Sequence, residues 1–359
     1  MPESLLACIP LLASAEMSRA FLFMCVVLAI GMLIWDTVEV GRNDAANLVN
    51  AVFGARILPR NVAVWVAGAG VVLGAVLSSQ VIDTARKGIF EPTQLTLAQA
   101  FAVYTTVYIV DTVLLYGYSA FGMPVSTTAC LVFSMLGASF VLGGFSIVHW
   151  EKAGEVVSGI VCSIFIAGIA GFLIQRAVRG AIGARGHTLS TLLMHGGWAG
   201  GGMLAMLCYF MLVKGMTSVS IVKTLNERLV DPYGVAPLVL GLWALFAILI
   251  HLCLITFREK AASRLFPVLA IIGTVCMGFA FGQNDLANCA APGLASWNLY
   301  QHQDVATATH TSVDRGLLLG CGVLLFLGMT TRNAQRVTRA SVSAGSMSHN
   351  VGLWAPRWC

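Results

Sequence analysis

Hydrophobic residues occur along this chain in long continuous runs, unlike the short alternating segments of a β-barrel. The first run, at residues 20–40, has about the twenty residues that a helix needs to cross the hydrocarbon core of a membrane. Similar runs follow at about residues 61–80, 97–118, 129–144, 156–173, 189–213, 235–257, 265–281 and 316–330. The pattern predicts an all-α polytopic helical bundle with about eight crossings or half-crossings of a membrane.

The composition agrees with a location in the lipid bilayer. Hydrophobic residues make up 58% of the chain and charged residues 10%, which leaves too little polar surface to cover a soluble domain. The 37 glycines suit helices that pack closely in lipid, and such faces permit a homodimer without requiring one. The net charge of +5 is scattered, so the basic stripe that a nucleic-acid partner needs is absent from the sequence.

The basic residues predict the topology. Two clusters of basic residues, at residues 176–187 and 258–264, are separated by two predicted crossings and therefore lie on one side. The positive-inside rule makes that side cytoplasmic, so residues 214–233 are expected outside and residues 331–359 form a cytoplasmic tail. We expect a multi-pass protein of the plasma (inner) membrane.

A polar sequence, Gly-x-Asn-Asp-x-Ala-Asn, occurs twice, at residues 41–47 and 282–288. Each copy follows a long apolar run, and repeated polar interruptions in two halves of a membrane protein indicate a midplane substrate site between structural repeats. Asparagine and aspartate oxygens suit Na⁺, and a carboxylate can alternatively carry a proton. A bound cation also offsets the cost of burying Asp44 and Asp285 as carboxylates.

A third polar stretch, Gly-Met-Pro-Val-Ser-Thr-Thr at residues 122–128, predicts a helix start near Pro124 at membrane depth. The N-terminus of a helix is an anion site, and Ser126, Thr127 and Thr128 add hydroxyl donors. An anion site beside a cation site is the arrangement of a co-transporter. We expect broken or re-entrant helices at all three polar stretches, because interrupted backbone in a membrane must line a cavity or be covered by protein.

Two further charged residues leave alternatives open. Asp111 lies within an apolar run and is either an intramembrane acid of the functional site or a partner in helix packing. Arg42, inside the first copy of the repeated motif, either faces the site and attracts anions or points toward a helix interface.

Together these motifs make residues 20–340 resemble the inorganic phosphate transporter (PiT) family, whose pattern also matches residues 83–89. The resemblance implies secondary transport of inorganic phosphate with Na⁺ or H⁺ as the coupling ion, two inverted repeats and no other cofactor. By matching position it places Asn43, Asp44, Asn284 and Asp285 in the substrate and cation sites. It places Ser126, Thr127 and Thr128 around phosphate, with Asn47 and Asn288 as further candidates for cation coupling.

The chain departs from the family pattern in its second half. After Asn288 it has about one clear span and no second Pro-Val-Ser-Thr-Thr. The expected organisation is an N-terminal segment, a first repeat, a connecting hairpin between two basic loops, an incomplete second repeat and a tail. The corresponding ranges are residues 1–19, 20–175, 176–264, 265–330 and 331–359.

Three alternative functions remain open from the sequence. A sulfate or other oxyanion permease would use the same motifs, and a truncated or assembly subunit that does not transport is a second alternative. A membrane enzyme is the third, but the seven histidines form no His-x-x-x-His pair and lie at no metal-ligand spacing to cysteine. The sequence therefore predicts a transporter that is not an enzyme.

Overall fold

The computed structural model describes residues 19–78, 94–183, 188–216, 219–303, 314–332 and 334–339. The expected N-terminal segment up to residue 18, residues 83–89 and the end of the expected tail lie outside this part of the chain. The helices are α2 (Arg19–Gly54), α3 (Arg60–Val76), α5 (Leu97–Ala120), α6 (Thr127–Gly143), α7 (Trp150–Ile182), α8 (Leu189–Cys208), α9 (Ser220–Leu225), α10 (Asp231–Tyr233), α11 (Val235–His302) and α13 (Arg315–Thr330), with π-helical turns at Tyr209–Lys214 and Asn226–Val230.

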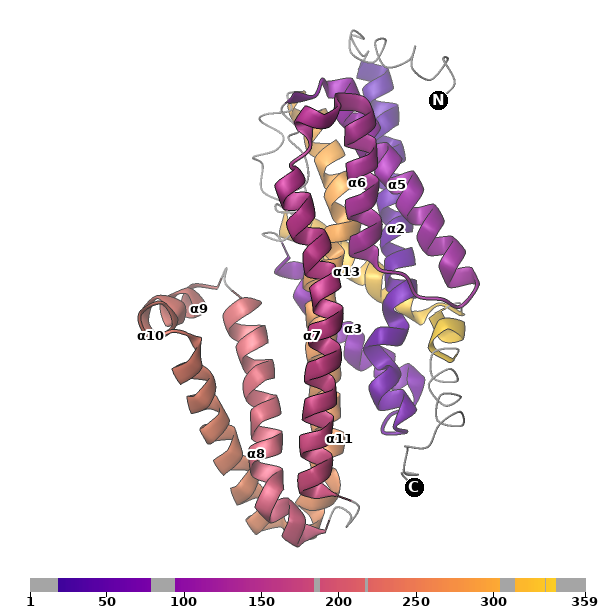
Figure 1. Cartoon of the computed structure of the whole chain (residues 1–359). Coiled ribbons are helices and arrows are strands. Elements are labelled where there is room, and N and C mark those ends of the chain that lie inside the picture. The colour runs from indigo at the N-terminus through magenta and orange to yellow at the C-terminus, as the bar shows by residue number, and fades with distance from the viewer. Residues whose placement is uncertain are drawn as a thin grey trace.

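Five helices in the described residues are long and apolar enough to cross a membrane, and shorter apolar helices accompany them. The chain is therefore the predicted all-α, multi-pass membrane protein. The 68-residue α11 reverses direction at Arg258, whose φ of 45° and ψ of −121° are not helical. Its first arm pairs with α8, and its second arm runs upward through the centre of the bundle (Figure 1).

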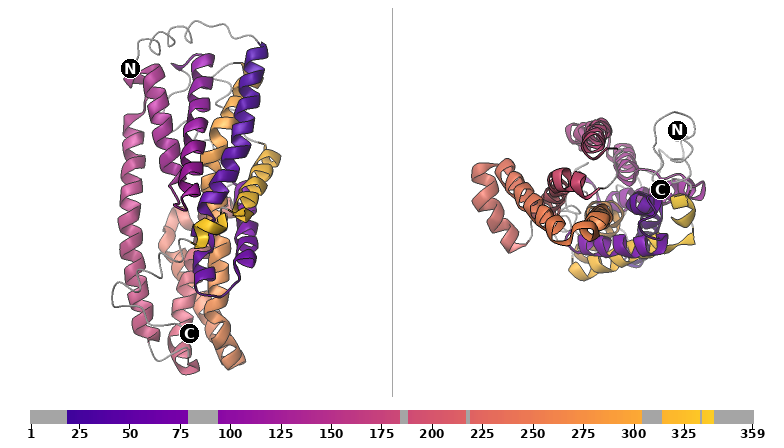
Figure 2. Two further views of the ribbon diagram at one scale, coloured as in Figure 1. Left: turned by 90° about the vertical axis from the view of Figure 1, so that its right-hand side faces the viewer. Right: turned by 90° about the horizontal axis from the view of Figure 1, so that it is seen from below.

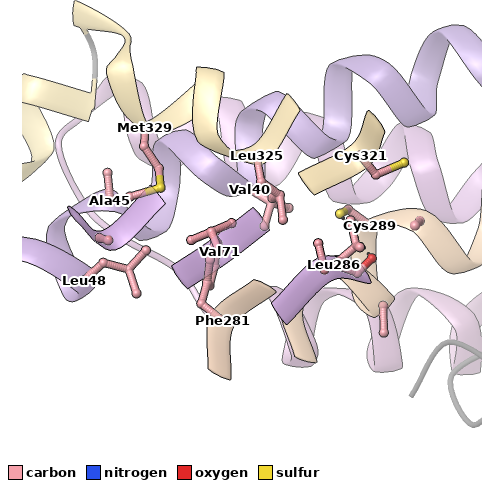
Figure 3. Packing of buried hydrophobic residues seen from close by; sticks show 14 of the residues in the cluster. Val40, Ala45, Leu48, Val71, Phe281, Leu286, Cys289, Cys321, Leu325 and Met329 are labelled. Atoms are coloured by element: carbon pink, nitrogen blue, oxygen red, sulfur yellow. Dashed lines mark hydrogen bonds between the residues drawn. The ribbon is translucent and has the colours of Figure 1, made fainter. Parts of the chain in front are cut away.

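The core is built from α2, α3, α13 and the second arm of α11. Figure 3 shows Val40 of α2, Val71 of α3, Phe281 of α11 and Leu325 of α13 in its buried apolar cluster. By contrast, α7 exposes apolar side chains along its length, as a helix in contact with lipid does. The two copies of the repeated motif thus lie on central helices, while α7 covers the bundle from outside (Figure 2).

The glycine that begins each motif copy allows close contact between helices. A Cβ on Gly41 would collide with the backbone of Leu325 in α13, and one on Gly282 would collide with the backbone of Val71 in α3. Small residues let membrane helices approach in this way. The glycines of the repeated motif are therefore explained by packing, without any contact to a ligand.

Gly41→Ala and Gly282→Ala should each destabilise the protein by about 1–3 kcal/mol, the typical cost of overpacking a fixed core. Thermal unfolding of the purified protein in detergent measures this change. Gly31→Ala is the matched control in α2, because a Cβ there meets no atom within 4 Å. Equal melting temperatures for all three variants and the wild type would contradict the packing explanation.

One of the three expected helix breaks is present. Helix α5 ends at Ala120, the chain turns, and α6 begins at Thr127, with the turn near mid-height of the bundle (Figures 1 and 2). The two motif copies instead lie within continuous helix, in α2 and in the second arm of α11. These two helices run in opposite directions (Figure 1). They stay helical through the motifs because the motif glycines pack closely against neighbouring helices, and because the polar side chains of the motifs form hydrogen bonds with other elements.

Several segments expected to be loops are helical. Arg179 lies in the last turn of α7, Lys260 and Arg264 lie just after the reversal of α11, and both basic segments are at the lower end of Figure 1. The segment expected outside, residues 214–233, forms α9, α10 and π-helical turns at mid-height instead of a loop at the upper end.

The start of the expected cytoplasmic tail also differs from a free tail. Residues 334–339 are helical, and Ala334, Val337 and Thr338 are fully buried. Ala334 belongs to the core cluster of α2, α3, α11 and α13, so this piece packs on the bundle by apolar contact.

Candidate functional site

Asn43 of α2 holds the turn between α5 and α6. Its side-chain Nδ2 donates to the Val125 carbonyl at 2.7 Å, and the Val125 N–H donates to its Oδ1 at 2.9 Å. Both backbone groups of one residue are therefore satisfied by one carboxamide whose residue is 0% exposed. This pair of bonds fixes the position at which α6 starts.

The first turn of α6 meets the second copy of the motif. The Thr127 hydroxyl donates to Asp285 Oδ1 at 2.7 Å. The amide of buried Asn288 donates to the hydroxyl of Thr128 at 2.9 Å, and it also lies 3.3 Å from Asp285 Oδ1 and 3.4 Å from the Thr127 hydroxyl. The beginning of α6 is thus joined to α11 by a network of side chains.

The first copy brings a second carboxylate to the same place. Asp44 accepts from Asn47 Nδ2 at 2.8 Å and from Asn43 Nδ2 at 3.2 Å, and it interacts electrostatically with Asp285. Both aspartates are partly exposed. Two neighbouring carboxylates repel each other unless a cation binds between them or a proton neutralises one of them.

Two predicted residues stand apart from this network. The Ser126 hydroxyl accepts from the Ala129 N–H at 3.3 Å and is the N-cap of α6, so α6 begins three residues after the position expected from Pro124. The Asn284 amide donates to the Ala280 carbonyl of its own helix at 3.0 Å, and its residue is exposed. Asn43 and Asn284 occupy the same motif position but have different partners.

The structure adds a residue that sequence reasoning missed. The Tyr108 hydroxyl of α5 donates to the Cys289 carbonyl at 2.8 Å and accepts from the Gly293 N–H at 2.7 Å. It therefore lies between two backbone groups that an α-helix would normally join directly. Pro292, one residue before Gly293, was the sequence signal for a local disturbance of α11 after the second motif.

The structure also decides between the alternatives for Arg42. Arg42 forms an ion pair with Glu39, one turn earlier in α2, and its guanidinium lies 5.0 Å from the centre of the Tyr116 ring of α5. It therefore contributes to the contact between α2 and α5. The buried Asp111 of α5 interacts electrostatically with Asp36 of α2.

Comparison with known proteins agrees with this geometry. A model described as the phosphate transporter family matches residues 40–344. A protein of Pyrococcus furiosus named "Putative phosphate permease" is 26% identical over 297 residues, which cover 81% of this chain and 70% of that protein. A protein of Thermococcus kodakarensis with the same description is 29% identical over 282 residues, or 76% of this chain and 65% of that protein.

A solved structure has the same fold. The sodium-dependent phosphate transporter matches with a TM-score of 0.74 and 22% sequence identity, over 89% of this chain and 78% of that chain. This similarity concerns the arrangement of helices. The match over residues 40–344 is what assigns the family, and the chain belongs to the phosphate transporter family, a family of transporters and not of enzymes.

Proposed function

We propose that this protein is a secondary transporter that moves inorganic phosphate across a membrane, with Na⁺ or H⁺ as the coupling ion. The observation that carries the proposal is the contact of Thr127, at the start of α6, with Asp285 in the second motif copy. It brings a helix N-terminus together with the two carboxylates at mid-height of the bundle. The membership of the family and the name of the structural neighbour support both substrate and cation.

The start of α6 supplies the anion side of this site. The first N–H groups of a helix have no partner inside the helix, and the macrodipole gives this end a partial positive charge. The hydroxyls of Ser126 and Thr128 accept hydrogen bonds here and keep their own hydrogens as donors for an oxyanion. The Thr127 hydroxyl donates to Asp285 in this conformation and would turn its hydrogen from Asp285 to a bound anion. Phosphate in this position would be held by backbone N–H and hydroxyl groups.

The two motif copies supply the cation side. Asp44 and Asp285, with the carboxamides of Asn47 and Asn288 beside them, offer oxygens for Na⁺ or carboxylates for a proton. Asn43 holds the turn before α6, and Asn284 contributes an exposed carboxamide. A cation bound here would neutralise the carboxylates and allow an anion to occupy the adjacent helix start.

The same proposal favours phosphate over sulfate. Phosphate keeps a proton at neutral pH and can donate a hydrogen bond to an ionised carboxylate, whereas sulfate carries no proton and can donate none. Asp285, already accepting from Thr127, is a carboxylate of this kind at the start of α6. Sulfate bound in its place would face the carboxylate without a hydrogen bond and be repelled.

Uptake of radiolabelled phosphate by proteoliposomes containing the 359-residue chain tests the proposal. Imposed Na⁺ and proton gradients are compared, with excess unlabelled sulfate as competitor. We expect gradient-dependent uptake that sulfate does not block. Correctly inserted protein that shows no uptake with either gradient would contradict the proposal and favour a subunit that does not transport.

The phosphate shell has its own test. Ser126→Ala combined with Thr127→Ala removes two hydroxyls at the helix start and should weaken phosphate binding by about tenfold, because the two lost hydrogen bonds together contribute roughly 1.4 kcal/mol. The half-saturation concentration for uptake measures this change. Ser158→Ala on α7 is the control, because its hydroxyl only donates to Glu155 of the same helix. An unchanged half-saturation concentration would mean that Ser126 and Thr127 serve only the helix start.

We further propose the plasma (inner) membrane as the location, with the basic end of α7 and the basic reversal of α11 on the cytoplasmic side. The opposite directions of α2 and the second arm of α11 support two inverted repeats, the second of which includes residues 265–330. We also propose a homodimer, because a Cβ on Gly159, Gly168 or Gly171 of α7 would meet no atom within 4 Å, and such small residues allow another membrane helix to pack closely. Disulfide cross-linking through exposed Cys162 of α7 tests that contact.

A further inference from the structure

A second pair of carboxyl groups lies inside the bundle, away from the repeated motif. Asp36 of α2 is 0% exposed and Asp111 of α5 is 1% exposed, and the two interact electrostatically. Each has one carboxyl oxygen that is buried without a hydrogen-bond partner, Oδ2 of Asp36 and Oδ1 of Asp111. Burying two ionised carboxylates side by side costs far more free energy than burying one ionised and one neutral group.

The other oxygens of the pair are satisfied by neutral donors. The Thr112 hydroxyl donates to Asp36 Oδ1 at 3.0 Å, and the Cys130 thiol donates to Asp111. The remaining titratable groups that interact with Asp36 are Tyr108 of α5, and Cys289 of α11. Groups on α5, α6 and α11 thus surround the pair, and among the described residues those that interact with it carry no positive charge.

A metal ion fits this surrounding poorly. Hard cations take six or more oxygen ligands, whereas the neighbours here are a thiol, the Thr112 hydroxyl and a Tyr108 hydroxyl that is already bonded to two backbone groups of α11. A proton needs only the two carboxyl groups. It would neutralise one of them and provide a donor for a carboxyl oxygen that now has none.

We propose that Asp36 and Asp111 form a proton-binding carboxyl pair, a site separate from the one between Asp44 and Asp285. The proton is held between the two carboxyl groups in this conformation and leaves when the surrounding helices separate and admit water. The pair lies eight residues before Asp44 in α2, about 12 Å along the helix. Cys130, its neighbour on α6, is one turn after Thr127, so a movement of α6 would reach both sites.

Infrared difference spectroscopy of the full chain in proteoliposomes detects the proton directly. A protonated carboxyl group has a C=O stretching band that shifts in D₂O and disappears on ionisation. We expect such a band in the wild type at neutral pH. In Asp36→Asn and in Asp111→Asn, the band of the remaining carboxyl should disappear at a pH about one unit lower, because the neighbouring negative charge is gone. The double variant should lack the band.

Asp231→Asn, on the exposed α10, is the matched control and should leave the band unchanged. Asparagine has nearly the shape of a protonated aspartic acid, so the variants should insert and fold like the wild type. Single variants whose band disappears at the wild-type pH would overturn the proposal. So would a wild-type band that is absent in Na⁺ buffer but emerges when a large organic cation replaces Na⁺, which would identify a metal site.

The spectrum requires no transport, so it can succeed or fail independently of the proposed function. Where phosphate uptake is observed, it adds a second test. Asp36→Asn and Asp111→Asn should then flatten the pH profile of uptake relative to Asp231→Asn, since one titrating pair is lost. Profiles identical to that of the control would argue that the pair keeps its proton throughout the transport cycle and would contradict its release.

Discussion

Asp44→Asn and Asp285→Asn should each reduce ion-coupled phosphate uptake by about 100-fold, because removing the charged partner of a hydrogen-bonded charge interaction costs roughly 3 kcal/mol. Asparagine keeps the shape of the side chain and its hydrogen bonds to Asn47 or Thr127 but removes the negative charge that a coupling cation needs. Uptake into proteoliposomes under an imposed gradient measures the loss.

The controls separate coupling from folding. Membrane insertion and the melting temperature should stay close to those of the wild type, because an amide replaces a carboxylate without changing volume. Asp231→Asn removes an exposed aspartate far from the site in the fold and should transport normally. Near-normal uptake by both Asp44→Asn and Asp285→Asn would show that the cation binds elsewhere.

The hydrophobic runs predicted most of the helices, because a membrane span is specified by length and composition. The predicted spans at residues 97–118 and 235–257 match α5 and the first arm of α11 within a few residues. The repeated motif also predicted which distant segments meet, since Asn43, Asp44, Asp285 and Asn288 all lie around the start of α6. The hydrophobic runs and the repeated motif were therefore sufficient to predict the spans and the residues near the start of α6.

Helix continuity at the motifs could not be predicted in the same way. Polar residues within an apolar run suggested a broken helix, but side chains on other elements satisfied them. Asn43 bonds to Val125, 82 residues away, and Tyr108 bonds to the α11 backbone at Cys289, 181 residues away. Such partners are set by tertiary packing, which no single segment of sequence contains.

Two local signals were nevertheless present. Glu39 precedes Arg42 by three residues, which is the spacing of an ion pair on one face of a helix. This spacing favours the role of Arg42 at a helix interface over its role in attracting anions to the site. Asp36 lies within the first apolar run, and Asp111 lies within another. The free-energy cost of removing a carboxylate from water makes both of them candidates for a functional site in the membrane. What the sequence lacked was the information that α2 and α5 bring these two aspartates together.

Asn43→Ala should weaken phosphate binding by tenfold or more, about 1.4 kcal/mol, because it leaves both backbone groups of Val125 without their partner and releases the turn before α6. Asn284→Ala, at the same position of the second motif copy, removes one bond to Ala280 of its own helix and should have a much smaller effect. Phosphate binding to the purified variants, measured by calorimetry, compares the two. Because the residues are identical in type and motif position, a difference between them isolates the contact with the α5–α6 turn. Equal losses would mean that both asparagines contact the ligand, and that the bonds of Asn43 to Val125 are incidental to binding.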